Sequence, residues 1–176
     1  MDDIGAKEDV TKLLASQDAQ TLAQTLLELA EDYAPVDQRL ERLRLQSDPA
    51  ALTAQFTQRL KRWDNNERYV LYQDAGAFGR ELDMWVAQVQ REMLPRFPAE
   101  AMKLFAAFME LDTLVFEHVD DDGGHVGGAF ELACDLWCAA AQATGFTAGE
   151  IADRASALLA ADHYGARARL EKALNR

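Results

Sequence analysis

The stretch HVDDDGGHVGG, residues 118–128, contains the residue types best suited to chemistry. Three consecutive aspartates meet four glycines, with a histidine on either side, and a glutamate follows closely. Carboxylate oxygens and imidazole nitrogens bind cations, and glycines permit the tight turns that bring such groups together. The candidate ion or interaction site consists of Asp120, Asp121, Asp122, His125 and Glu131.

Calcium is the first chemistry to test on this loop. Counted from Asp120, the carboxylates of Asp122 and Glu131 fall at positions three and twelve, where an EF-hand has ligands. Position six, at which an EF-hand turns sharply on a glycine, is His125, and the loop offers fewer oxygens than calcium takes. A metal-binding or metal-regulated protein that uses the Asp120–Glu131 loop is therefore kept as the alternative function.

Phosphate fits the loop less well. Glycines that precede a helix can present backbone N–H groups to an anion. The spacing is not GxGxxG, no Walker lysine follows, and the neighbouring aspartates repel an anion. We set the phosphate interpretation aside.

Cysteines and histidines could supply a transition-metal site. Cys134 and Cys138 lie four residues apart on one face of a predicted helix, and the histidines are His118, His125 and His163. The cysteines are embedded in the apolar segment LACDLWCAAA, where free cysteine behaves as a small buried hydrophobe. The serines have no nucleophile-elbow context. We predict no catalytic residue, no metal site and no cofactor.

The elements that must position these residues are helices. Apolar residues recur at steps of three and four, which places each set on one helix face that must be buried against a neighbour. No alternating pattern typical of strands occurs. The four stripes are Leu22, Leu26, Leu29 and Tyr33; Leu52, Phe56, Leu60 and Trp63; Phe78, Leu82, Trp85, Val89 and Met93; and Phe130, Ala133, Trp137 and Ala140.

Capping signals mark the predicted boundaries. Asp48 before Pro49 is typical of a helix start, Thr147 with Glu150 forms a capping box, and Asp74 is a predicted cap. The predicted helices are 7–15, 18–33, 35–46, 49–63, 75–94, 98–119, 125–144, 148–161 and 166–174. We predict one all-α domain over residues 1–176, with a disordered tail at 1–6. Its eight or nine helices stack as antiparallel hairpins in an α-solenoid or TPR-like superhelix, with a closed helical bundle as the alternative.

The charge excludes some partners. The net charge of -12 disfavours nucleic acid and anionic membranes. The acidic start is unlike a signal peptide, no apolar run is long enough to span a membrane, and two cysteines make no disulfide framework, so we predict a cytoplasmic protein. Residues 104–153 carry ten acids and no Lys or Arg, whereas residues 39–68 carry seven bases against four acids.

Three segments together resemble a known family. LLELAEDYAPVDQRLERL, SDPAALTAQFTQRL and HVDDDGGHVGGAFELACDLWCAAA resemble a bacterial family of uncharacterised helical domains, which occur alone or follow a SWIM-type zinc finger. The resemblance implies an all-α fold of stacked hairpins and no known activity. The zinc-finger ligands are missing from this chain. We predict a non-enzymatic module that binds a protein partner or forms a homo-oligomer, through an acidic face at 104–153 that meets a basic partner or the basic 39–68 region of a second copy.

Overall fold

The structure is a computed structural model that describes residues 3–65 and 68–174, with side chains from residue 8 onward. Its backbone contacts group into two compact units, Met1–Ser47 and Asp48–Arg176, termed here the N-terminal unit and the C-terminal unit. The single domain over 1–176 stays a prediction. Of its predicted disordered tail, residues 1 and 2 lie outside the described residues, and the first helix begins at Asp3.

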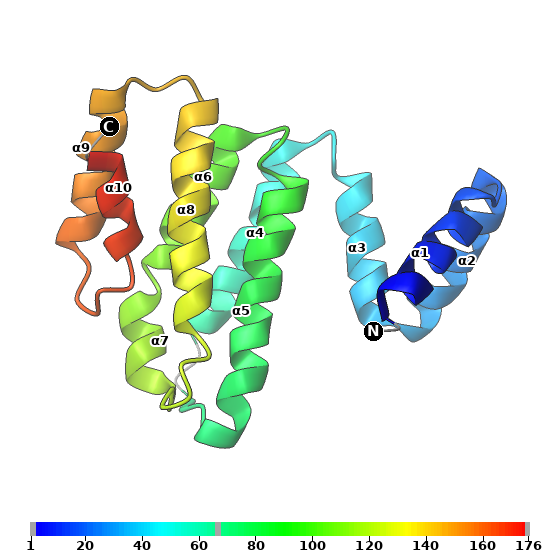
Figure 1. The fold of residues 1–176 in the computed structure, drawn as a ribbon, viewed down its shortest axis with the longest axis horizontal. Coiled ribbons are helices and arrows are strands. Elements are labelled where there is room, and N and C mark those ends of the chain that lie inside the picture. Colours follow the sequence, from blue (N-terminus) through cyan, green and yellow to red (C-terminus); the bar gives the residue numbers. More distant parts are fainter. Residues whose placement is uncertain (1–2, 66–67, 175–176) are drawn as a thin grey trace. The chain divides into compact units, whose positions relative to one another are not determined.

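The all-α class is confirmed for the described residues, and the nine helices α1 to α9 agree with the predicted eight or nine (Figure 1). A 3-10 helix of three residues and the four-residue α10 come in addition. No strand occurs among them apart from an isolated bridge between Val70 and Val119. The N-terminal unit contains α1 (Asp3–Ala15), α2 (Ala19–Asp32) and α3 (Ala34–Arg44). The C-terminal unit contains α4 (Pro49–Asp64), α5 (Tyr72–Glu92), α6 (Pro98–Met109), α7 (Asp112–His118), α8 (Gly127–Ala143), α9 (Ala148–Ala160), a 3-10 helix (Ala168–Leu170) and α10 (Glu171–Leu174).

Two of the three predicted helix caps are confirmed. The Asp48 carboxylate accepts a hydrogen bond from the backbone N–H of Ala51 at 3.0 Å, at the start of α4. Thr147 and Glu150 form the complete capping box of α9. The cap at Asp74 is wrong, because α5 begins earlier, at Tyr72, and Asp74 lies in its first turn.

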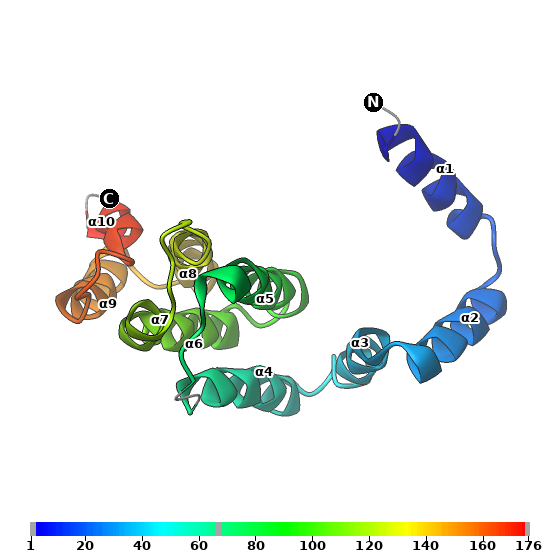
Figure 2. The same ribbon diagram turned by 90° about the horizontal axis from the view of Figure 1, so that it is seen from below.

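The C-terminal unit is built around α6. Half of the residues of α6 are buried, including Phe105 and Phe108, and Figure 2 shows the helix between α4 on one side and α8 on the other. The rings of Trp85 and Phe108 stack with centroids 5.2 Å apart, and the next pair, Phe108 and Phe130, lies at 4.8 Å. The aromatic core therefore runs without a break from α5 through α6 to α8.

All three tryptophans belong to this core, as predicted. Trp63, Trp85 and Trp137 are buried, and the indole N–H of Trp85 donates to the carbonyl oxygen of Phe56 at 3.3 Å. The stripes of α4 and α8 are buried completely, and that of α5 is buried from Leu82 onward. Three of the four predicted stripes thus lie in the core.

The predicted long helix over 98–119 is wrong in one respect: it is two helices. The helix is interrupted between Met109 and Asp112, although no proline or glycine lies there. The break coincides with the burial of Asp112, whose side chain bonds to Arg167 and to the N–H of Thr113. The predicted helix over 166–174 is likewise shorter, because residues up to Arg167 form a turn.

The helices of the C-terminal unit do not pack only against their neighbours in sequence. The most extensive backbone contact is that between α6 and α8, although α7 lies between them in sequence. The superhelical stack therefore stays a prediction. None of the helices in the described part of the chain is long and apolar enough to cross a membrane.

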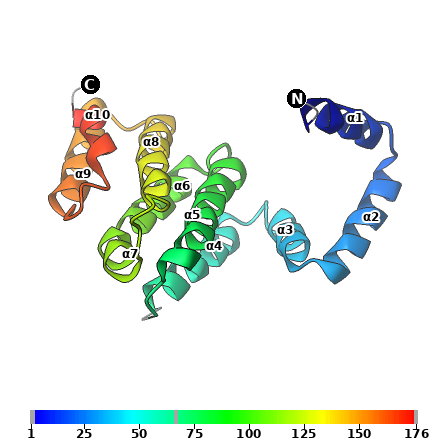
Figure 3. The ribbon, with the colours of Figure 1, turned by 60° about the horizontal axis from the view of Figure 1, so that its bottom comes forward.

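The N-terminal unit is more open. Figures 2 and 3 show α1, α2 and α3 following one another as a hook, with α1 and α2 joined at their ends rather than packed along their lengths. The closest backbone approach in this unit is between α2 and α3. The fourth predicted stripe lies here, on α2, and none of the residues of α2 is buried.

Candidate functional site

The segment 119–126 between α7 and α8, termed here the acidic-glycine turn, is hydrogen-bonded to the chain before α5. The backbone N–H of Val70 donates to the carbonyl oxygen of His118 at 2.8 Å, and the N–H of Asp120 donates to the carbonyl oxygen of Val70 at 2.9 Å. These two bonds form the isolated bridge between Val70 and Val119. The turn is thus held at its first residues by backbone, independently of any ion.

Asp121 organises the rest of the turn. Its carboxylate accepts hydrogen bonds from the backbone N–H groups of His125, at 2.5 Å, and Val126, at 3.3 Å. Its carbonyl oxygen accepts from the N–H of Gly124, which has a φ of +67°. The N-cap residue of α8 is Val126 and no side chain caps this helix, so neither Asp121 nor Asp122 is its cap. Gly124 adopts its left-handed conformation within the turn, after the previous helix has ended at His118.

The candidate residues of the loop do not converge. Asp121 faces backbone N–H groups, and the Glu131 carboxylate bonds to Arg169, away from the turn. Among the residues that the structure describes, no group of three or more His, Cys, Asp or Glu side chains is placed to hold a metal ion. The alternative function, metal binding by the Asp120–Glu131 loop, gains no support from this geometry.

Gly127 and Gly128 begin α8, where a glycine costs up to about 1 kcal/mol relative to alanine. Close approach of a neighbouring backbone does not explain them, because a Cβ at either position would meet no atom within 4 Å. The close approach occurs instead at Gly79 of α5, where a Cβ would overlap the carbonyl oxygen of His125. Gly79 is therefore the glycine that lets the turn pack on α5.

The two cysteines differ in environment. Cys134 is fully buried, and its thiol lies 3.3 Å from the sulfur of Met109 and 3.8 Å from the carbonyl oxygen of Ala166. Burial, and then the nearby Cys138, raise the pKa of the Cys134 thiol to about 12. Such a thiol is a packing group and not a nucleophile at neutral pH. Cys138 is half-buried.

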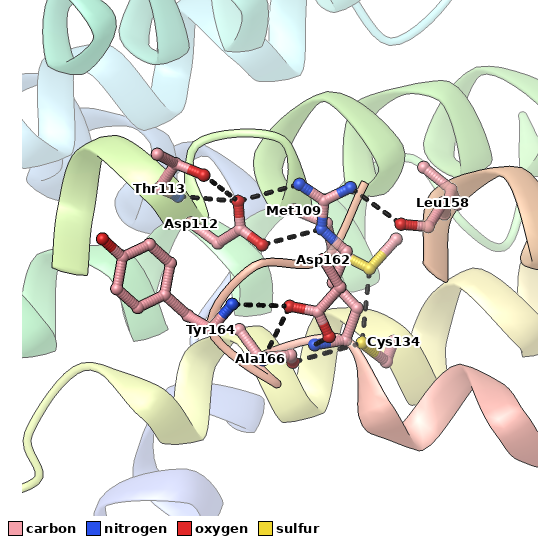
Figure 4. Close-up of polar contacts among 9 residues, drawn as sticks. Met109, Asp112, Thr113, Cys134, Leu158, Asp162, Tyr164 and Ala166 are labelled. Carbon is pink, nitrogen blue, oxygen red and sulfur yellow. Dashed lines mark hydrogen bonds and ion pairs between the residues drawn. The ribbon is translucent and has the colours of Figure 1, made fainter. Parts of the chain in front are cut away.

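A buried ion pair that sequence reasoning missed lies beside Cys134 (Figure 4). Arg167 donates from Nε and Nη2 to the two oxygens of Asp112, each at 2.8 Å, and from Nη1 to the carbonyl oxygen of Leu158 at 3.0 Å. Asp112 and Arg167 are both buried. Asp162 orders the turn that carries Arg167. Its carboxylate accepts hydrogen bonds from the backbone N–H groups of Tyr164, Ala166 and Arg167.

Two further acids of the stretch 104–153, which has no Lys or Arg, form ion pairs with basic residues near the C-terminal end of the chain. Arg169 bonds to Glu131 and, at 2.6 Å, to Asp135; Lys172 lies 3.4 Å from Asp135. The hydrogen bond to Asp135 raises the pKa of Arg169. The predicted acidic face at 104–153 is therefore partly neutralised within the chain. The signal was present in the sequence: a stretch without bases is followed by three bases within six residues, Arg167 to Lys172.

A cavity of about 520 Å³ lies between α8, α9 and α10. Its lining is mainly apolar, with the Cys138 thiol and the paired Asp135 and Lys172 as the reactive or charged groups. No histidine is among the residues that line the cavity.

The strongest candidate site is the apolar face of α2. At about 100° per residue, apolar residues fill one continuous arc of roughly 160°, and polar residues fill the remainder. This apolar face consists of Ala19, Leu22, Ala23, Leu26, Leu27, Leu29 and Ala30. Leu26 is 42 % exposed and Leu27 57 % exposed. A face of this kind is ordinarily buried against a neighbour, and within the N-terminal unit it is left uncovered.

Fold and site together define an all-α protein with an exposed amphipathic helix and, among the described residues, no group of side chains placed to hold a metal ion. The chain belongs to a family of unknown function, DUF6880, whose model matches residues 10–176. The matched residues include α2 and α3. No curated protein and no solved structure matches the chain.

Proposed function

We propose that this protein is a non-enzymatic helical interaction module whose contact surface is the apolar face of α2. The observation that carries the proposal is the contrast between the four predicted stripes. Three lie in the core, and the fourth, with the same spacing, has none of its residues buried. An isolated helix of this length is marginal in water, because most helical stability comes from burial of such a face.

The ion pairs of Asp112, Glu131 and Asp135 with C-terminal bases act within the chain, so these three acids stabilise the fold and are neutralised in part before any partner binds. The predicted cytoplasmic location, and the likeness to bacterial helical regions that follow SWIM-type zinc fingers, are consistent with an interaction role and remain part of this proposal.

Photo-cross-linking in the native host tests the proposal. Benzoylphenylalanine is placed at Leu26, on the apolar face, or at Gln24, on the opposite side of the same helix. We expect a discrete cross-linked product from position 26 and none from position 24, because only position 26 is covered by a partner. Equal products from both positions, or none from position 26, would show that α2 is not the contact surface.

A further inference from the structure

The cavity between α8, α9 and α10 is lined by one alanine from each of these helices. The three residues are Ala139, Ala148 and Ala173. Protein interiors are closely packed, and larger apolar side chains at these positions would fill the space that the methyl groups leave. The volume of about 520 Å³ lies within the range of small-molecule sites, about 300–1,000 Å³. Because Ala139 and Ala148 are exposed, the cavity is open to solvent and a ligand can enter it.

Contacts outside the cavity hold its walls in place. Arg169 binds Asp135 at 2.6 Å, and Lys172 lies 3.4 Å from the same carboxylate, so the C-terminal segment is attached to α8. The capping box of Thr147 and Glu150 fixes the start of α9. The backbone of α9 packs mainly on α10 and less on α8. The cavity is therefore formed by the folded chain itself, before any ligand binds.

The wall of the cavity favours an uncharged ligand with an apolar body. Phe146 and Ile151 add apolar surface to that of the three alanines. The charged groups of the wall, Asp135 and Lys172, lie 3.4 Å apart and compensate each other. An ion that entered the cavity would lose water without gaining an opposite charge of its own, which is unfavourable.

Gln142 supplies a polar contact for such a ligand. It lines the cavity, and its side-chain amide forms no hydrogen bond with any residue in the described part of the chain. A side-chain amide both donates and accepts hydrogen bonds. It therefore suits a ligand that carries one hydroxyl, carbonyl or amide group on an otherwise apolar body.

We propose that this cavity binds a small, uncharged, mainly apolar molecule whose one polar group pairs with the amide of Gln142. All the residues that line the cavity belong to the C-terminal unit. The proposed site is therefore separate from the apolar face of α2, and it does not depend on the proposed function.

The first experiment titrates the full chain with N-phenylnaphthylamine, an uncharged probe whose fluorescence rises in apolar surroundings. We expect saturable binding of one probe per chain. Ala139→Trp should weaken it tenfold or more, because the indole fills the cavity. Ala157→Trp is the control, on the exposed side of α9 away from Ala148 and Ile151, and should change the affinity less than twofold. Circular dichroism checks that both variants are folded. Absence of saturable binding, or equal affinities of the two variants, would overturn the proposal.

Leu26→Glu tests whether the probe binds the apolar face of α2 instead. Leu26 is exposed on that face and far from the cavity in sequence. We expect this variant to bind the probe within twofold of the native chain. If Leu26→Glu abolished binding and Ala139→Trp did not, the probe would lie on α2 and the cavity site would be overturned, whereas the interaction module would stand.

The thiol of Cys138 reports where the probe lies, because it forms part of the cavity wall. We expect a saturating concentration of N-phenylnaphthylamine to slow the alkylation of Cys138 by iodoacetamide fivefold or more. An unchanged rate would mean that the probe leaves the cavity open, and would contradict the proposed site.

Three competitors of similar size test the class of ligand: toluene, p-cresol and p-toluate. We expect toluene and p-cresol to displace the probe and the anion p-toluate to displace it least. Gln142→Leu should weaken p-cresol about fivefold, because its hydroxyl loses a hydrogen bond, and should change toluene less than twofold. Strongest displacement by p-toluate would overturn the uncharged class of ligand. Equal effects of Gln142→Leu on p-cresol and toluene would overturn the role of Gln142.

Discussion

Arg167 and Asp112, 55 residues apart in sequence, are joined by two hydrogen bonds of 2.8 Å in a buried, bidentate pair. The third guanidinium donor reaches the carbonyl oxygen of Leu158, at the end of α9. Because two charges can be buried only when each finds its partners, this pair fixes the turn after α9 against the start of α7. The C-terminal segment is held by charge as well as by packing.

Loss of one member of this pair should be costly. Arg167→Ala leaves the Asp112 carboxylate buried without its guanidinium, and we expect a loss of about 3–5 kcal/mol in the free energy of unfolding. Urea denaturation followed by tryptophan fluorescence measures it. Arg169→Ala is the control, because its half-exposed pairs with Glu131 and Asp135 are worth about 0–1 kcal/mol. Equal losses for the two variants would contradict the buried geometry.

Replacement of both charges should cost less than replacement of one. In Asp112→Leu with Arg167→Met no unpaired charge remains, and buried pairs replaced by apolar side chains of similar volume are often neutral. We expect the double variant to be more stable than Arg167→Ala alone, with the lost hydrogen bonds to the Leu158 carbonyl and from the Thr113 N–H as the remaining cost. A double variant as unstable as the sum of the single variants would mean that the two residues act independently.

Two helical glycines should respond to alanine with opposite signs. Gly79→Ala forces a methyl group against the carbonyl oxygen of His125, and we expect destabilisation of about 1–3 kcal/mol. Gly128→Ala meets no atom within 4 Å and should stabilise α8 by up to about 1 kcal/mol. Thermal melts of the two variants beside the native chain give the signs. If Gly128→Ala were destabilised instead, glycine would be required at that position for a reason other than the room available for a side chain.

The two cysteines should differ in alkylation. We expect iodoacetamide to modify Cys138 in the native protein and to modify Cys134 only after unfolding, because burial raises the pKa of the Cys134 thiol to about 12. No Lys or Arg lies between Lys103 and Arg154, so both cysteines fall on one tryptic peptide and fragment ions must assign the label. Equal rates at the two positions would show that Cys134 is accessible.

The same thiol predicts a loss of stability at alkaline pH. A folded-state pKa above the ordinary 9.0 means that the folded chain holds this proton more tightly than the unfolded chain. Its contribution to stability is fully present below pH 9.0 and is lost as the pH rises toward 12. Cys134→Ala should flatten the decline of stability over this window in urea denaturation at stepped pH.

The capping box of α9 predicts the opposite dependence at acid pH. Hydrogen bonds from the Thr147 backbone N–H, at 2.9 Å, and hydroxyl lower the pKa of Glu150 below its ordinary 4.5. The stabilisation is therefore present above pH 4.5 and is lost as the pH falls through the lowered value. Thr147→Ala should cost about 1 kcal/mol at neutral pH. The difference between the two proteins should shrink in acid, and a constant difference would argue against the Glu150 contribution.

Local signals in the sequence predict the helices and most of the core. The spacing of Leu52, Phe56 and Leu60 reports burial because a helix face that is apolar must be covered. The caps at Asp48 and Thr147 were likewise readable, because they depend on residues three positions apart. The predicted cap at Asp74 was wrong because a capping residue must directly precede the first residue of the helix, and α5 begins at Tyr72.

What the sequence could not show are contacts between distant residues. The break before Asp112 depends on Arg167, and the space at Gly79 depends on His125; neither partner is marked by its neighbours in sequence. The sequence predicts a turn at the candidate loop, but it cannot decide whether the side chains of that loop converge on an ion. Only the three-dimensional positions show that Asp121 faces backbone N–H groups and that Glu131 faces Arg169.

The division into two units means that one melting temperature cannot describe this chain. Trp63, Trp85 and Trp137 all lie in the C-terminal unit, so indole fluorescence follows that unit alone. None of the described hydrophobic residues of the N-terminal unit is buried, so this unit lacks such a core. Circular dichroism reports the helices of both units and should show a loss of helix that indole fluorescence does not follow. A melt followed by one of the two probes alone would describe only part of the chain.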